Sequence, residues 1–233
     1  MDPLLPRAVD GYLDDLVTAQ LYDPVLVDLE RRAEALDLPT RGRAVGRHLE
    51  IVLKLAGARR VVQLAAGFGE TTYWLARAVG DDGEVIATIE DPDDAGVAES
   101  MLRRAGLFDR VTILPLAPGA ALATVTGDVD AVVGPVDAGA GGAWAGGVSR
   151  DGDDADDPAA RLWIEAADRV AVGGILALLD VLRGGDVARG PGALDSPALD
   201  RVIAISREVV NDPRYDSTIT PLRDGIQLAR RHR

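Results

Sequence analysis

The stretch of residues 61–72 constrains this chain more than any other. A run rich in Val and Leu meets two close-set glycines, Gly67 and Gly69, and a helical pattern follows at once. Strand, tight turn and helix in this order are typical of the first crossover of a nucleotide-binding α/β fold. Such glycines let the backbone approach a ligand, and the helix start offers free N–H groups to a polar or anionic group.

A second apolar run, residues 85–89, ends at Glu90. A carboxylate at that place can accept hydrogen bonds from both hydroxyls of a ribose. Glycine turn and acid together indicate a nucleotide-type ligand better than either does alone. An NAD-dependent enzyme is a weaker interpretation, because its third glycine would fall at position 72, where Thr72 stands.

The composition excludes several classes of protein. The 233 residues suit one domain with a small helical appendage, and 47% apolar residues suffice for a core. No cysteine is present, which rules out disulfides and cysteine-based metal or redox sites. No apolar run approaches the length of a membrane span, and the N-terminus lacks signal-peptide features. We therefore expect a cytoplasmic protein with no membrane partner.

The net charge of −13 comes largely from aspartate, and Lys54 is the only lysine. Such a surface repels phosphates, and no basic stripe is visible, so we expect no nucleic-acid partner. Acid-rich, lysine-poor surfaces are typical of halophilic proteins, in which salt screens the self-repulsion. We favour that interpretation over recognition of a cationic partner.

The order of elements predicts an α/β fold with a Rossmann-like, doubly wound, mostly parallel sheet. Three N-terminal helices are expected to cover it, so residues 1–57 are assigned to a helical cap and residues 58–233 to the main domain. The chain should close with an antiparallel hairpin joined at Arg223–Asp224–Gly225. The expected helices are 8–20, 24–36, 43–55, 72–79, 91–105, 158–170 and 197–210, and the expected strands are 61–64, 85–90, 111–114, 130–134, 175–179, 217–222 and 226–230.

Residues 138–157 are rich in Gly and then in Asp, and also contain Trp144. This composition indicates a mobile or salt-solvated loop. A calcium loop is the alternative, but the spacing of the acids does not fit an EF-hand.

From these motifs the chain resembles the class I S-adenosylmethionine-dependent O-methyltransferases, in particular the catechol and caffeoyl-CoA group. The resemblance covers almost the whole length. The segments that carry it are residues 57–64, 67–76, 81–85, 88–92, 105–111, 173–177, 212–215 and 224–231. The family's terminal antiparallel hairpin is in keeping with the last two predicted strands.

The resemblance implies that S-adenosylmethionine, or its product S-adenosylhomocysteine, binds across the tips of the first two strands. Its amino-acid portion would lie over Gly67 and Gly69, near the hydroxyl of Thr71, and its ribose would meet Glu90. The positions expected to bind this cofactor are Ala65, Gly67, Phe68, Gly69, Thr71 and Glu90. Ala65 replaces the motif's first glycine and Gln63 its acid, and the acid after the third strand falls at Ala117.

In this family a divalent metal, typically magnesium, grips the acceptor oxygens and a lysine helps to remove the proton. Here the metal positions fall at Pro135, Leu179 and Asp180, and the lysine falls at Ala138. Proline and leucine side chains cannot ligate magnesium, and alanine cannot take a proton. We therefore expect no metal site.

Asp137 and Asp180 remain at neighbouring strand tips and are the candidate catalytic residues. The alternatives are a shifted cation site, or two acids that only cap loops. The favoured function is O-methylation of a small hydroxylated acceptor without the metal. The alternative is a non-catalytic descendant that binds the donor, its product or a protein partner. A homodimer is expected by analogy with the family.

Overall fold

The computed structural model describes residues 5–35, 40–138 and 157–233. Its seven strands form one sheet in the order β3-β2-β1-β4-β5-β7-β6, with the first five parallel and β7 antiparallel to both neighbours. The predicted doubly wound sheet with a closing hairpin is confirmed. The strands are β1 (Arg60–Gln63), β2 (Glu84–Thr88), β3 (Val111–Leu114), β4 (Val129–Pro135), β5 (Val170–Leu179), β6 (Tyr215–Thr220) and β7 (Ile226–Arg231).

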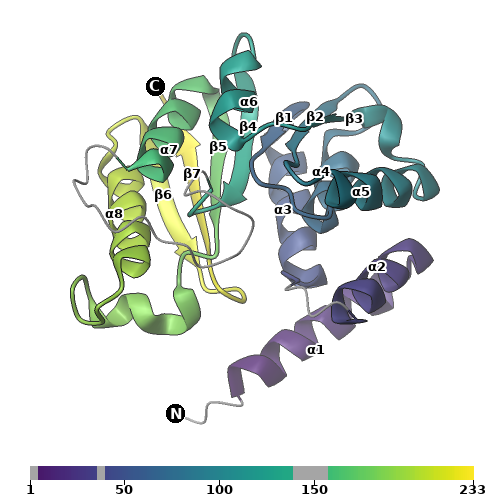
Figure 1. The fold of residues 1–233 in the computed structure, drawn as a ribbon, viewed down its shortest axis with the longest axis horizontal. Helices are drawn as coiled ribbons and strands as arrows, with labels where there is room; N and C mark the ends of the chain where they lie inside the picture. Colours follow the sequence, from purple (N-terminus) through teal and green to yellow (C-terminus); the bar gives the residue numbers. More distant parts are fainter. Residues whose placement is uncertain (1–4, 36–39, 139–156) are drawn as a thin grey trace.

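Helices cover both faces of the sheet (Figure 1). One apolar core lies between the sheet and α3, α4 and α5, and a second lies between the sheet and α6, α7 and α8. The short α6 and two 3-10 segments lie in stretches where the sequence predicted no helix. The helices are α1 (Leu5–Gln20), α2 (Pro24–Ala35), α3 (Arg43–Ala56), α4 (Glu70–Val79), α5 (Pro92–Arg104), α6 (Pro118–Thr124), α7 (Pro158–Arg169) and α8 (Pro197–Asn211), with 3-10 segments η1 (Phe108–Arg110) and η3 (Arg183–Arg189).

Strand β5 begins five residues earlier than predicted. We expected a helix through Val170 and a connection ending at Gly173–Gly174, but residues 170–174 belong to β5. The pairing with β4 is irregular there, since Val129 pairs with Val170 but Ala131 with Ile175. A Cβ on Gly174 would lie 2.6 Å from the Asp130 carbonyl oxygen. The glycine therefore permits close approach of two strands, and does not mark the end of a loop.

Helix α3 leaves room for a large side chain of α4 at Gly46. A Cβ on Gly46 would lie 2.1 Å from the indole of Trp74, which is buried, as is Trp163 on α7. The predicted packing role of both tryptophans is confirmed. The fully buried carboxylate of Glu50 accepts bonds from Arg47 (2.7 Å) and Lys54 (2.6 Å). Burial opposes its ionisation, but the cations outweigh burial and hold the pKa of Glu50 below its ordinary value.

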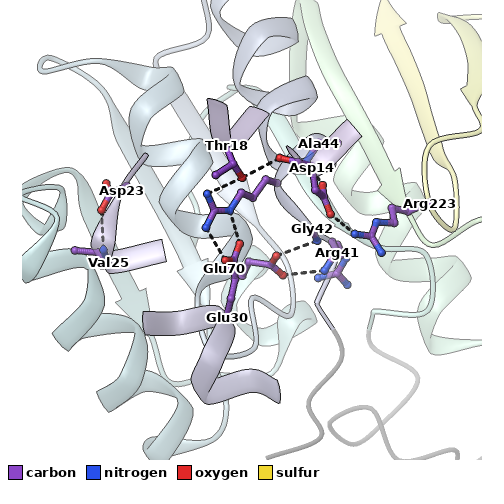
Figure 2. A network of polar contacts seen from close by, with 11 residues as sticks. Asp14, Thr18, Asp23, Val25, Glu30, Arg41, Gly42, Ala44, Glu70 and Arg223 are labelled. Carbon is purple, nitrogen blue, oxygen red and sulfur yellow. Dashed lines mark hydrogen bonds and ion pairs between the residues drawn. The ribbon is translucent and has the colours of Figure 1, made fainter. Parts of the chain in front are cut away.

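Helix α1 is held by polar contacts more than by apolar ones, whereas α2 buries its apolar face, with Leu26, Leu29 and Ala33 in the interior. Val9 and Leu16 on α1 are 47% and 45% exposed. Instead Asp14 accepts a bond from the backbone N–H of Ala44 (2.8 Å) and pairs with Arg223 in the β6–β7 turn (Figure 2). Because that turn lies at the carboxyl end of β5, α1 is fixed beside this edge of the sheet.

Residues 139–156 lie outside the described residues, and with them the predicted Gly- and Asp-rich loop, the calcium alternative and Trp144. The expected end of the second helix at residue 36 also lies outside them, since α2 is described to Ala35. The division of the chain at residue 57 stays a prediction. Within the described ranges, no helix has the length and apolarity required to cross a bilayer.

Candidate functional site

The candidate residues lie along the carboxyl edge of the five parallel strands. Strand β1 pairs with β2 on one side and with β4 on the other, so the order of the strands reverses there. In open α/β sheets, ligands bind outside the carboxyl ends of the strands at such a reversal. Two regions meet at this edge. We call residues 64–72 with Glu90 the β1–β2 corner, and residues 135–138 with residues 179–183 the β4–β5 corner.

The turn after β1 is fastened to β2. The backbone N–H of Ala65 donates to Thr88 Oγ1 (2.7 Å), and the N–H of Ala66 donates to the Thr88 carbonyl (2.8 Å). Ala65 has φ 47°, in the left-handed region. A side chain costs about 1–2 kcal/mol there, and the family motif has glycine at this position. The tip of β1 therefore holds a strained backbone in a fixed place.

The two glycines of the turn have different surroundings. Gly67 has φ 54°, and nothing lies within 4 Å of the place that a Cβ would take. Gly69 has φ 91°, and its Cβ would lie 2.7 Å from the Cβ of Ala98 on α5. Gly67 thus borders open space, whereas Gly69 is required for packing. Phe68, which lies between the two glycines, packs on the core and lines a cavity of about 490 Å³ between α2 and α5.

The remaining side chains of the β1–β2 corner differ in exposure. Thr71 is buried in the first turn of α4, and Thr72 donates to the Oε1 of buried Gln63 (2.7 Å). Gln63 thereby fixes the start of α4 from the position at which the family has an acid. Glu90 is exposed just after β2, and the adjacent Asp91, not Glu90, caps α5. The carboxylate of Glu90 therefore does not serve as the N-cap of α5.

At the β4–β5 corner each candidate carboxylate pairs with an arginine. Asp137 binds the guanidinium of Arg183. Asp180, with φ 62°, accepts two bonds on Oδ2 from Arg41, from Nε at 3.1 Å and from Nη2 at 2.7 Å. The Arg41 and Asp180 side chains are only 14% and 16% exposed. The two acids predicted to be catalytic are thus brought to one edge, but each is engaged by a cation.

Glu70 connects the two corners, and sequence reasoning missed it. This buried carboxylate at the start of α4 accepts the backbone N–H groups of Arg41 (2.9 Å) and Gly42 (3.0 Å), as Figure 2 shows. Burial raises the pKa of Glu70, and the two N–H bonds and the Arg41 charge offset this only in part. Glu70 therefore holds the backbone of the residue whose guanidinium reaches Asp180.

The family's metal does not fit the side chains present. Pro135 and Leu179 are buried partners across the β4–β5 ladder whose side chains carry no ligand atom, and Ala138 is buried at the lysine position. Asp180 is the one aligned carboxylate, and a guanidinium adjoins it. Over the ranges that the structure describes, no three His, Asp or Glu side chains gather as a metal-binding group.

The pairing of Arg41 with Asp180 had no visible signal in the sequence, because the two residues are 139 positions apart. Glu70 was read only as part of the glycine motif. The one available hint is that Glu70 lies in the first turn of α4 and is buried, because a buried acid requires hydrogen-bond donors from another part of the chain.

Comparison with known proteins places this geometry in a family. Residues 22–130 match the model of the O-methyltransferase family. The chain is 30% identical over 216 residues to a catechol O-methyltransferase of Mycobacterium tuberculosis (strain ATCC 25618 / H37Rv), covering 91% of this chain and 88% of that relative.

Two solved structures share the fold over nearly their whole length. One is a putative caffeoyl-CoA O-methyltransferase from Staphylococcus aureus, with TM-score 0.77, 15% identity and 96% and 99% of the two chains covered. The other is the O-methyltransferase TomG from Streptomyces achromogenes in complex with SAM, with TM-score 0.73, 22% identity and 99% of both chains covered. Sequence similarity covers 91% of the chain and the shared fold nearly all of it, and the chain belongs to the O-methyltransferase family.

Proposed function

We propose that this protein is an S-adenosylmethionine-dependent O-methyltransferase that acts on a small acceptor without the family's magnesium ion. The observation that carries the proposal is the β1–β2 corner. Open space adjoins Gly67 at the tip of β1, and the carboxylate of Glu90 is exposed at the tip of the adjacent strand. These are the places that the resemblance assigns to the amino-acid portion and the ribose of the donor.

The residues of this corner have separate roles in the proposal. Gly67 lets the backbone approach the donor, and Glu90 accepts bonds from the ribose hydroxyls. Ala65 and Thr71 line the turn, and Gly69 acts by packing α5 beneath it. Once bound, the donor supplies a methyl group on a positively charged sulfur, so orientation of the acceptor is the main task left to the protein.

The β4–β5 corner supports the part of the proposal that concerns the metal. Two of the three aligned ligand positions lack side-chain oxygen atoms, and the third adjoins Arg41. Asp137 is the remaining acid, and it pairs with Arg183. Magnesium is held by carboxylates together with water or substrate oxygens, and this donor set is too poor for it. We assign no reaction step to a metal.

Calorimetric titration with S-adenosylhomocysteine tests the donor site. Wild type should bind one equivalent, and Glu90→Ala should weaken the affinity by about 1–3 kcal/mol because the ribose hydroxyls lose a charged partner. Glu165→Ala, which removes an exposed acid on α7, is the matched control and should bind as wild type does. Equal affinity of wild type and Glu90→Ala would reject the assigned ribose contact, and failure of wild type to bind would reject the function.

The comparisons do not favour the alternative of a non-catalytic descendant, since the full-length relative is named as an enzyme. Two finer expectations remain proposals. The excess of acids over bases supports adaptation to high salt, and analogy with the family supports a homodimer.

A further inference from the structure

The cavity of about 490 Å³ between α2 and α5 is not explained by the donor site (Figure 1). Its floor is apolar, since Leu29 and Ala33 of α2, Met101 of α5 and Phe68 of the turn after β1 all line it. Protein interiors are close-packed and contain few voids larger than a water molecule. Pockets that hold small ligands measure about 300–1,000 Å³ and combine an apolar lining with a few polar groups. The size and floor of this cavity are therefore those of a ligand site.

One wall of the cavity contains a glycine that packing does not require. Gly96 lies within α5 and lines the cavity, and nothing lies within 4 Å of the place that its Cβ would take. A glycine inside a helix costs about 1 kcal/mol relative to alanine. Helix α5 is thus less stable than it could be at a point where the missing side chain leaves the cavity open.

The charged groups at the cavity are unequally satisfied. Near the end of α5, Arg104 pairs with Asp28 of α2 at 2.6 Å, so these two lining residues neutralise each other. Asp93 and Asp94 line the cavity from the first turn of α5, whose N-cap is Asp91. Within the described part of the chain, neither side-chain carboxylate has a hydrogen bond or a cationic partner. Uncompensated negative charge therefore lies at the end of the cavity that the first turn of α5 forms.

The surroundings of Asp94 favour the arrival of a positive charge. Burial raises the pKa of Asp94, and the carboxylates of Asp91 and Asp93 raise it further. A cation beside these acids would offset both effects. Arg32 also lines the cavity, from α2, but it is exposed, and its long side chain can hold its charge in water. The net charge of −13 attracts cations to the whole molecule as well.

The cavity is distinct from the place proposed for the donor. Of the six positions expected to bind S-adenosylmethionine, all of them described, Phe68 alone lines it. Gly67 borders open space, whereas Phe68 packs on the core. Met101 lies on the α5 side of the turn, since a Cβ on Gly69 would lie 3.3 Å from its Cε. The cavity thus adjoins the turn from the side of α5, and a ligand there leaves the donor's place free.

We propose that this cavity is a second ligand site, separate from that of the methyl donor, and that its ligand is a small organic cation. The ammonium group lies beside Asp93 and Asp94, and the apolar body lies against the floor around Phe68. Such a ligand answers the unpaired acids and also removes the apolar floor from water. A metal ion has no apolar surface, and the two acids repel a carboxylate. The inference goes beyond the proposed function and does not depend on methyl transfer.

The experiment uses three probes with the same ring and different charge. They are tryptamine, which is cationic, tryptophol, which is neutral, and indoleacetate, which is anionic. Each is titrated into the full chain with and without saturating S-adenosylhomocysteine, and binding is followed by ligand-observed NMR. The variants are Ser100→Phe, which obstructs the cavity from an exposed position of its wall, and the double variant Asp93→Asn with Asp94→Asn.

The matched control is the double variant Asp81→Asn with Asp82→Asn. These exposed adjacent acids lie between α4 and β2, at the opposite end of β2 from the start of α5, and their loss changes the net charge equally. Wild type and this control should bind tryptamine about fivefold or more tightly than tryptophol, and indoleacetate most weakly.

The two cavity variants should act differently. The double variant Asp93→Asn with Asp94→Asn should bind tryptamine and tryptophol alike, because the apolar floor remains and the charge does not. Ser100→Phe should lose all three probes. Saturation with S-adenosylhomocysteine should leave tryptamine bound to the wild type.

The proposal is overturned if tryptamine does not bind the wild type, or if tryptophol or indoleacetate binds as tightly. Undiminished preference for the cation in the variant without Asp93 and Asp94, or undiminished binding to Ser100→Phe, would place the probe elsewhere and overturn it too. Displacement of tryptamine by S-adenosylhomocysteine would make the cavity part of the donor site.

Thermal melting of each variant is recorded in parallel. If Ser100→Phe fails to fold, Gly96→Leu takes its place, because leucine is a better helix former than glycine and the position has free space. Failure of the wild type to bind S-adenosylhomocysteine would count against the proposed function alone, since the comparison of the three probes is complete without it.

Discussion

The β1–β2 corner and the β4–β5 corner lie side by side on one sheet edge, but they differ in what fills them. At the first, Gly67 borders open space and Glu90 is exposed. At the second, Asp137 and Asp180 are each paired with an arginine, and the residues next to each acid in the sequence are buried and apolar. One corner keeps groups available to a ligand, while the other satisfies its charges from within the chain.

The contrast teaches that two corners of one sheet edge can be completed in different ways, one with exposed groups and the other with ion pairs. In the proposed function, the turn of the β1–β2 corner needs only backbone shape and one carboxylate to hold the donor. The half-buried carboxylate of Asp180 at the β4–β5 corner requires a cationic partner, because an unpaired charge largely removed from water is costly. Arg41 meets that requirement at Asp180, and its backbone is tied to the first corner by Glu70.

The largest expected effect is a difference in folding stability between substitutions at two glycines of the β1–β2 corner. Gly69→Ala should destabilise the fold by about 3 kcal/mol, because its Cβ would meet Ala98 and its backbone is left-handed. Gly67→Ala should cost only about 1 kcal/mol, from backbone conformation alone. Urea unfolding of both variants measures the difference.

The two glycine variants should rank in the opposite order when ligand binding is measured, with the larger loss at Gly67→Ala. Gly67→Ala places a methyl group in the open space over the turn and should weaken S-adenosylhomocysteine by about tenfold, whereas folded Gly69→Ala should bind nearly as wild type does. Equal losses of stability in the two variants would show that Gly67 is also a packing residue and would remove the contrast.

A smaller effect concerns the acid that connects the corners. Burial raises the pKa of Glu70 above its ordinary value of 4.5, so the fold favours the neutral carboxyl. That contribution to stability is complete below the ordinary pKa and is lost as pH rises through the raised pKa. Wild type should therefore lose free energy of unfolding relative to Glu70→Gln as pH increases above about 4.5.

Urea titrations of both proteins across that range measure this pH dependence, with Glu165→Gln as the exposed control on α7. A difference between wild type and Glu70→Gln that stays constant with pH would contradict the role assigned to burial.

Sequence reasoning reached the fold because local signals and topology agree. The apolar runs, the glycine turn and the closing hairpin identified each of the seven strands, although β5 begins at Val170 since glycines in an irregular strand look like a loop. The β1–β2 corner is contiguous apart from Glu90, so its residues could be predicted, and their roles remain to be tested. The β4–β5 corner depends on Arg41 and Arg183, whose partners lie 139 and 46 positions away. No periodicity or motif encodes such pairings.

Manganese titration tests the central claim most directly, namely that the acids of the β4–β5 corner are engaged by arginines and do not form a metal site. Protein saturated with S-adenosylhomocysteine is titrated with Mn²⁺, and free manganese is followed by electron paramagnetic resonance. We predict no stoichiometric site in the wild type. One bound Mn²⁺ per chain, lost in Asp180→Asn and in Asp137→Asn, would contradict the account and show that the two acids form a shifted metal site.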